Sequence, residues 1–126
     1  MLKAKTTTIG KQAERAALHY LTQQGLKLES QNFHSRWGEI DLIMRDHNAT
    51  LVFVEVRSRK KSLYGNAASS INITKQQKLI KTALVYLQKF KSPPNTRFDV
   101  IAIDHHTGND LNAHIQWIQN AFESQG

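Results

Sequence analysis

Residues 38–59 constrain the fold of this chain most strongly, because GEIDLIMRDHNATLVFVEVRSR contains two apolar, strand-like runs around a short polar turn. We predict these strands at about 38–45 and 50–57, paired as an antiparallel hairpin. Three acids, Glu39, Asp41 and Glu55, interrupt the apolar pattern. Acids are poor strand formers and are seldom buried without a partner. Their presence in this hairpin therefore requires a physical reason.

Hairpin pairing predicts that Asp41 and Glu55 lie close together. In a hairpin, the residue numbers of each opposed pair add up to the same value. A loop of residues 45–50 gives a sum near 95, and Asp41 and Glu55 add up to 96, so they are opposed to within one residue. Opposed residues have Cβ atoms about 5 Å apart. Two ionised carboxylates at that distance repel by roughly 3 kcal/mol at an effective dielectric constant of about 20. A register slip of one residue would instead send the two acids to opposite faces.

Alternation along the strands gives each of them one mixed face and one apolar face. The mixed faces carry Glu39, Asp41 and Ile43 in the first strand, and Phe53, Glu55 and Arg57 in the second. The apolar faces carry Ile40, Leu42 and Met44, and Val52, Val54 and Val56. We expect the two apolar faces to match and to form the core side of the sheet.

Two arrangements could offset the repulsion between the acids, and spacing alone leaves both open. A divalent cation such as Mg²⁺ or Mn²⁺ binds carboxylate oxygens, and the backbone carbonyl of Val56, beside Glu55, would be a further ligand. Alternatively, Arg57 neutralises the acids on a polar sheet face. Glu39 is either a neighbour of the metal or a solvated acid near the start of its strand.

The remaining pattern predicts one domain of the α/β class over residues 1–126. Helices are expected at 9–24, between an N-cap at Thr8 and a stop at Gly25, and at 74–90, where Thr74 and Gln77 fit a capping box. The apolar face of the second helix would comprise Leu79, Ile80, Ala83, Leu84 and Leu87. Further strands are expected at 26–33, 97–104 and 113–118. The order α-β-β-β-α-β-β predicts a mixed sheet with helices packed on it.

The charge of the chain is consistent with a nucleic-acid partner. Seventeen Lys and Arg residues against ten acids give a net charge of +7. Arg57, Arg59, Lys60 and Lys61 follow the second strand, and Lys75, Lys78 and Lys81 recur every three residues in the second predicted helix. A solvated basic surface would explain the charge equally well.

Composition also excludes several classes of protein. The chain has no cysteine and therefore no disulfide or thiolate metal site. Its apolar runs are all shorter than the roughly 18–20 residues of a membrane span. The start, MLKAKTTTIGK, lacks the apolar stretch of a secretory signal. We therefore expect a cytoplasmic protein with no membrane partner.

Motifs across nearly the whole chain resemble one family of small bacterial proteins. They include Gly10 with Glu14, the runs GEIDLI and FVEVR, Lys75-Gln76, and RFDVI at 97–101. Together these motifs resemble the YraN-like proteins, long labelled uncharacterised. That family is similar to the PD-(D/E)xK nuclease superfamily, whose fold resembles restriction enzymes and archaeal Holliday-junction resolvases. The resemblance implies a restriction endonuclease-like fold.

The resemblance also implies roles for individual residues. Asp41 and Glu55 would bind the metal, and Glu14 would match an additional acid of the resolvase-like branch. Arg57 falls where the superfamily has its lysine, which is a departure, because arginine is a poor general base although its fork can hold a phosphate oxygen. Lys75, in the first turn of the second predicted helix, is the candidate to replace that lysine.

These roles imply metal-assisted hydrolysis of phosphodiester bonds, in DNA rather than RNA and including branched or damaged structures. Arg57 and Lys75 would offset the charge that develops on the phosphate. The residues expected to grip the nucleic acid are Arg57, Arg59, Lys60, Lys61, Lys75, Gln76 and Lys78. A homodimer would supply two sites for two strands. One alternative is a catalytically inactive nucleic-acid-binding domain with the nuclease fold. Another is a protein-interaction module with a surface acid pair.

Several other polar or aromatic residues allow a functional or a structural interpretation. His105 and His106, with Asp104 and Asp110, form either a metal site or a solvated turn. His34, Arg36 and Trp37 lead into the acid-bearing strand and would contact a nucleotide, although Trp37 fits a core or rim position equally well. We expect Trp117 in the core. We also expect Asp99 to be a structural residue that accepts hydrogen bonds from a nearby backbone group.

Overall fold

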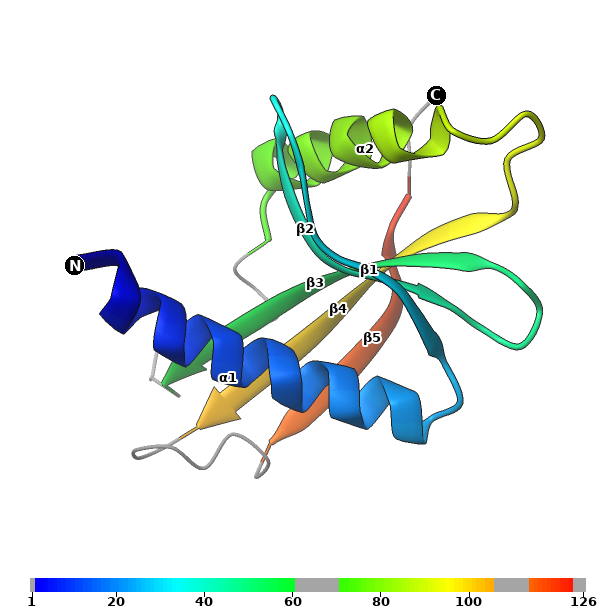
Figure 1. The fold of residues 1–126 in the computed structure, drawn as a ribbon. Coiled ribbons are helices and arrows are strands. Elements are labelled where there is room, and N and C mark those ends of the chain that lie inside the picture. Colours follow the sequence, from blue (N-terminus) through cyan, green and yellow to red (C-terminus); the bar gives the residue numbers. More distant parts are fainter. Residues whose placement is uncertain (1, 61–70, 106–113, 124–126) are drawn as a thin grey trace.

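The computed structural model describes residues 2–60, 71–105 and 114–123, and their side chains over 10–58, 71–103 and 114–123 (Figure 1). The elements are α1 (Leu2–Gln23), β1 (Lys27–Ser35), β2 (Gly38–Arg45), β3 (Leu51–Lys60), α2 (Ile73–Leu87), β4 (Thr96–His105) and β5 (Ile115–Phe122). This order confirms the predicted α-β-β-β-α-β-β arrangement and the α/β class. Within the described residues, no helix is long and apolar enough to cross a membrane.

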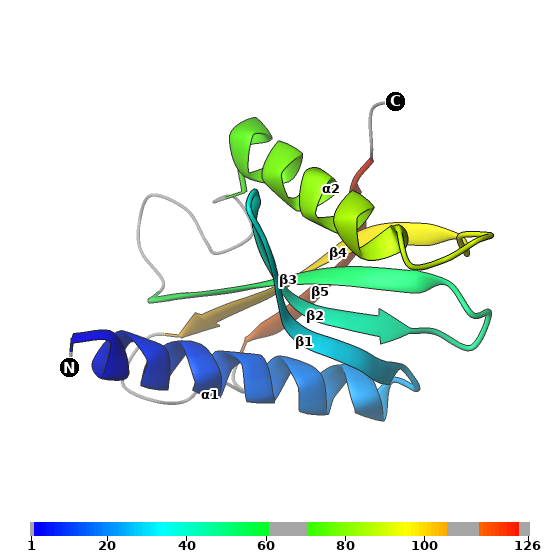
Figure 2. The ribbon, with the colours of Figure 1, turned by 45° about the horizontal axis from the view of Figure 1, so that its top comes forward.

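The five strands form one sheet in the order β1-β2-β3-β4-β5. β3 and β4 are parallel, and the other neighbouring strands are antiparallel. A parallel pair needs a crossover, and α2 provides it between β3 and β4. Figure 2 shows α1 against one face of the sheet and α2 on the other side. The sheet is therefore mixed and flanked by helices, as predicted.

Hydrophobic clusters lie on both faces of the sheet. On one face Ala13, Ala17 and Leu21 of α1 pack with the cluster that includes Leu42, Met44, Val52, Val54, Ile101 and Ile103. On the other face Leu79, Ala83 and Tyr86 of α2 pack with Ile40, Ile43, Leu51, Phe53 and Phe98. The prediction of a single core side is therefore wrong, because α2 also covers the face that carries Phe53.

The register of the β2–β3 hairpin is within one residue of the one that the turn predicted, and it is the register in which Asp41 would lie opposite Glu55. The paired residues run from Arg45 with Leu51 to Leu42 with Val54, and their numbers sum to 96. Beyond Leu42 and Val54 this pairing ends, whereas β2 stays paired with β1 as far as Gly38. The hairpin of β1 and β2 curls away from β3 toward α2 (Figure 1).

The curl overturns one prediction about β2. Ile40 was expected to share a face with Leu42 and Met44, but it packs in the α2-side cluster. The cause lies in β1. Asn32 is next to Asp41, between the paired residues Gln31–Leu42 and Phe33–Ile40, and it has a left-handed φ of 50°. Asn is one of the few residues that adopts this conformation readily, so it allows a bend that interrupts regular alternation.

The helix boundaries correct further predictions. Thr8 lies inside α1 and is not its N-cap. Asn72, and not Thr74, caps α2: its side-chain oxygen accepts a hydrogen bond from the Lys75 N–H at 2.9 Å. Leu84 is 56% exposed, so its predicted place on the buried face is wrong, and Tyr86 is buried instead. Gly25 has a φ of +97° just after α1, as expected of a helix stop.

Asp99 is a buried structural acid, as predicted. Its carboxylate accepts hydrogen bonds from the Asn120 backbone N–H and the Trp117 indole N–H, each at 2.9 Å, and from Arg97. Arg97 also donates to Asp46 in the turn between β2 and β3. Trp117 is partly buried against the α1-side cluster. This network ties β4 to β5 and to the β2–β3 turn.

The tip of the β1–β2 hairpin is fixed to α2 by a chain of hydrogen bonds. The buried Thr82 hydroxyl donates to the Lys78 carbonyl at 2.9 Å. A hydroxyl has one proton, so at the 2.9 Å contact between Ser35 and Thr82 the Ser35 hydroxyl is the donor. The Trp37 backbone N–H in turn donates to Ser35 at 3.0 Å. The hairpin tip is thereby held against the helix.

We expect Thr82→Val to lower the free energy of unfolding by about 1 to 2 kcal/mol, because a near-isosteric methyl removes both hydrogen bonds of the hydroxyl. Chemical denaturation measures the change, with the exposed Thr22→Val on α1 as the control. Equal stability of the two variants would show that the link between Ser35 and Thr82 contributes nothing.

Candidate active site

The candidate site lies in the fork where β2 separates from β3. The carboxylate of Asp41, on β2, accepts a hydrogen bond from the Val56 backbone N–H of β3 at 2.8 Å. The N–H and C=O of a strand residue point to the same edge of the strand. The Val56 carbonyl is therefore on the Asp41 side of β3, and its role as a metal ligand stays a prediction.

The predicted acid pair meets in this fork. The Asp41 and Glu55 carboxyl groups share a hydrogen bond, and Glu55 is only 5% exposed. Its Oε2 atom lies 3.5 Å from the Lys75 Nζ of α2 and 3.5 Å from the Arg57 Nη1 of β3. The structure thus brings together four of the five residues for which a catalytic role was predicted.

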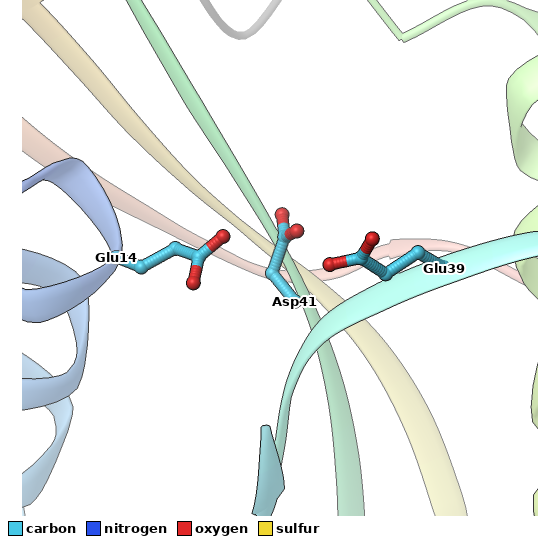
Figure 3. A group of neighbouring side chains, drawn as sticks. All are labelled: Glu14, Glu39 and Asp41. Carbon is cyan, nitrogen blue, oxygen red and sulfur yellow. The ribbon is translucent and has the colours of Figure 1, made fainter. Parts of the chain in front are cut away.

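The fifth, Glu14 of α1, lies close to Asp41 in a second group of acids. Oxygen atoms from the carboxylates of Glu14, Glu39 and Asp41 lie within 4.8 Å of one another. Figure 3 shows the Glu14 and Glu39 side chains extending from opposite sides toward Asp41. Glu39 therefore lies beside Asp41, and its role as a neighbour of a metal stays a prediction. Asp41 therefore belongs both to this triad and to the pair with Glu55.

Asn32 organises the triad, and sequence reasoning assigned it no function. Its side-chain amide donates to Glu14 at 3.0 Å and to Glu39 at 2.8 Å. One amide group thus links an acid of α1 to an acid of β2. The available signal was an asparagine inside a predicted strand, where this residue type is depleted. On the outer side, His34 Nδ1 lies 3.5 Å from Glu39.

Burial and mutual repulsion perturb the central acids. Burial, together with the smaller effect of the Glu55 charge, raises the pKa of Asp41 to about 8, although the hydrogen bond from Val56 opposes the shift. Burial also raises the pKa of Glu55, although Lys75 and Arg57 oppose the shift. At neutral pH without metal, Asp41 is therefore mainly protonated and donates its proton to Glu55. Such perturbed acids are typical of functional sites.

The raised pKa of Asp41 predicts a pH-dependent stability of the metal-free protein. Between its ordinary value of 3.8 and about 8, the unfolded chain loses a proton that the folded chain keeps. The free energy of unfolding should therefore fall as pH rises through this range. Asp41→Asn removes this titration, so at pH 7.5 in EDTA the variant should be more stable than wild type, by on the order of 2 kcal/mol.

Chemical denaturation at pH 5, 6.5 and 8 tests this prediction, with the exposed Glu123→Gln as a charge-matched control. The control should follow the wild-type slope. If wild type and Asp41→Asn have parallel pH profiles, Asp41 is ionised in the metal-free protein and the burial argument fails.

The acid triad suits a hard divalent cation. Oxygen atoms 2.0–2.1 Å from a Mg²⁺ ion are separated from one another by about 2.9–4.2 Å, so the triad needs only small side-chain rotations to reach that geometry. Lys75 and Arg57 each lie 3.5 Å from Glu55, the acid outside this triad. A divalent ion would also offset the repulsion between Asp41 and its neighbouring acids.

The residues predicted to bind nucleic acid differ in how exposed their side chains are. Lys78 is exposed on α2, whereas the Gln76 side chain is half-buried and donates to the Ile71 carbonyl at 3.4 Å. Arg59 and Lys60 end β3, and their side chains are outside the described part of the chain. Lys61, His106 and Asp110 also lie outside it, as do the side chains of Asp104 and His105.

Comparison with known proteins places the chain among close relatives. The model of a family described as "Uncharacterised protein family UPF0102" matches residues 13–103. A UPF0102 protein of Herminiimonas arsenicoxydans is 48% identical over 116 residues, covering 92% of this chain and 87% of that protein. A UPF0102 protein of Psychromonas ingrahamii is 51% identical over 111 residues, covering 88% and 86%.

Proposed function

The chain belongs to the UPF0102 family, the YraN-like proteins, and we propose that it is a metal-dependent nuclease that hydrolyses phosphodiester bonds in DNA. One observation carries the proposal. Four carboxyl groups from α1, β2 and β3 converge on the fork around Asp41, and Lys75 and Arg57 contact the innermost of them, Glu55.

The charge distribution supports a phosphate substrate. Acids that can hold a divalent cation lie beside two cations that can bind phosphate oxygens, and the chain as a whole is basic. A phosphodiester requires both features, because its own negative charge must be neutralised before a nucleophile can approach. The hydrogen-bond donors to the triad, the Asn32 amide and the Val56 backbone N–H, are neutral, so they do not compensate the negative charge of three ionised acids.

Each residue of the site would have a separate role in the reaction. Glu14, Glu39 and Asp41 would hold the cation, which when bound polarises phosphate and lowers the pKa of water. Glu55 would hold the Lys75 ammonium in place beside the substrate. Lys75 and Arg57 would donate hydrogen bonds to the phosphate oxygens as negative charge develops there. In the reaction, a water oxygen bonds to phosphorus while the bond to the leaving oxygen breaks and a proton passes to that oxygen.

The test is a cleavage assay on single-stranded, duplex and branched DNA of the same sequences, with Mg²⁺, Mn²⁺ or EDTA. The proposal expects cleavage that requires the metal. Salt-sensitive binding with no cleavage of any substrate would favour the alternative, a catalytically inactive nucleic-acid-binding domain. If the protein neither binds nor cleaves any of these substrates at low salt, both the nuclease and the binding function are refuted.

A further inference from the structure

An exposed tryptophan stands at the tip of the β1–β2 hairpin, outside the acid cluster. Trp37 is 37% exposed, and its ring has two cations against it. The Arg36 guanidinium carbon is 4.6 Å from the centre of the ring, and the Lys81 ammonium is 4.5 Å from it. A large aromatic ring exposed between cations is a recurrent feature of surfaces that bind single-stranded nucleic acid.

The ring has a fixed place relative to the site. The Trp37 backbone N–H donates a hydrogen bond to the Ser35 hydroxyl, which is hydrogen-bonded to the buried Thr82 of α2. Three residues separate Trp37 from Asp41 on the same hairpin, which corresponds to a distance of at most about 13 Å. The hairpin tip reaches α2 in both ribbon views (Figures 1 and 2). Trp37 is therefore a rigid neighbour of the acid cluster.

A row of lysines on α2 connects the two places. Lys75 contacts Glu55 in the fork, and Lys81 contacts the Trp37 ring. Lys78 lies between them, with its Cβ 3.9 Å from the position that a Cβ on Gly38 would occupy. Residues three apart are neighbours on a helix, and six residues span about 9 Å. Glu39, the acid that follows Gly38, accepts a hydrogen bond from Asn32.

We propose that Trp37 is a stacking platform for an unpaired base of a nucleic-acid strand whose phosphates follow Lys81, Lys78 and Lys75 toward the acid cluster. The inference rests on the proposed function for the chemical class of the ligand, and it adds that the site prefers strands with unstacked bases. Single strands and the unpaired regions of branched DNA offer such bases, whereas a continuous duplex does not.

Base stacking on the Trp37 ring is expected to be stronger than the cation–π contacts that the ring makes with Arg36 and Lys81. An exposed cation–π contact corresponds to a factor of about 2 to 5 in an equilibrium constant, whereas a base stacked on an aromatic side chain contributes about 5- to 100-fold. A base can therefore displace Arg36 or Lys81 from the ring. The displaced cation then becomes available for the adjacent phosphate.

The test measures binding in EDTA, so that cleavage plays no part. Fluorescence anisotropy compares a labelled single strand of about 15 nucleotides with an abasic strand of equal length and charge, and with a duplex. Wild type should bind the base-containing strand about 5- to 100-fold more tightly than the abasic one. Trp37→Ala should lose this ratio but keep abasic-strand affinity, and Trp37→Phe should retain part of it.

Leu84→Ala is the matched control, because it truncates another exposed apolar side chain on α2 and should leave the ratio unchanged. Thermal unfolding verifies that each variant is folded. A wild-type protein that binds both strands equally, or a folded Trp37→Ala variant that keeps the full ratio, overturns the stacking proposal alone. A wild-type protein that binds no strand overturns the proposed nucleic-acid function with it.

Discussion

Replacing Asp41 with Asn should lower metal-dependent DNA cleavage by at least about a thousandfold while the protein stays folded. Asp41 belongs to both groups of acids in the fork, the triad with Glu14 and Glu39 and the pair with Glu55. An amide keeps the size of the side chain but not its charge, and a metal ion contributes several kcal/mol of charge stabilisation to such reactions. The loss should therefore appear in the rate of the chemical step.

Single-turnover cleavage at saturating protein measures this rate, and isothermal titration with Mg²⁺ or Mn²⁺ measures metal affinity directly. Both should decline in Asp41→Asn, whereas Glu123→Gln, which removes an exposed acid at the end of the described chain, should leave both unchanged. Cleavage that survives Asp41→Asn would locate the chemistry elsewhere, and we would then abandon the fork as the active site.

Two further variants distinguish which acids hold the metal. The sequence-based assignment relies on Asp41 and Glu55, whereas the structure groups Asp41 with Glu14 and Glu39. If the triad holds the ion, Glu39→Gln should weaken metal binding more than Glu55→Gln does. The reverse order would favour Asp41 and Glu55 as the ligands, with Glu39 supporting the site only through Asn32.

The acid pair was predictable from sequence because its position depends on local rules. A short polar turn fixes the register of a hairpin, and strand alternation then fixes which side chains face each other. The observed register places Leu42 opposite Val54 and so carries Asp41 to Glu55. No tertiary information was needed for this step.

The bend in the hairpin was not predictable, because it depends on contacts between distant residues. Asn32 adopts a left-handed φ of 50° and bonds Glu14, which lies 18 residues earlier on α1. That geometry moves Glu39 into the site and turns Ile40 toward α2. A pattern of period two contains no signal for such a bend.

The rotation of α2 about its own axis was likewise set by packing. Apolar periodicity favoured burial of Leu84, yet Tyr86 is buried because its ring packs edge-on against Phe33 and Phe53 and its hydroxyl bonds Glu29 at 3.2 Å. Periodicity assigns an apolar stripe, but it does not distinguish Tyr from Leu at the stripe's edge. This rotation also directs Lys75 toward the fork and Lys81 toward Trp37.

Lys75→Met should lower the cleavage rate by about 10²- to 10³-fold with little change in metal affinity. Arg57 stands on β3 where the resemblance to the nuclease superfamily would predict a lysine, and Lys75 reaches the same Glu55 oxygen from α2 at 3.5 Å. Loss of one donor to developing negative charge has an effect of this size. Because Glu55 is buried, the variant should also shift the pKa of Glu55 upward, which denaturation at several pH values detects.

Lys78→Met is the matched control, since it removes the same charge three residues further along α2, where the side chain is exposed. It should weaken DNA binding in a salt-dependent way and leave the single-turnover rate unchanged. Arg57→Lys should retain activity, because it places a cation, and the lysine that the resemblance to the nuclease superfamily predicts, at this position. If Lys75→Met cleaves like wild type while Arg57→Met is inactive, the arginine of β3 is the essential cation and α2 serves only to bind the strand.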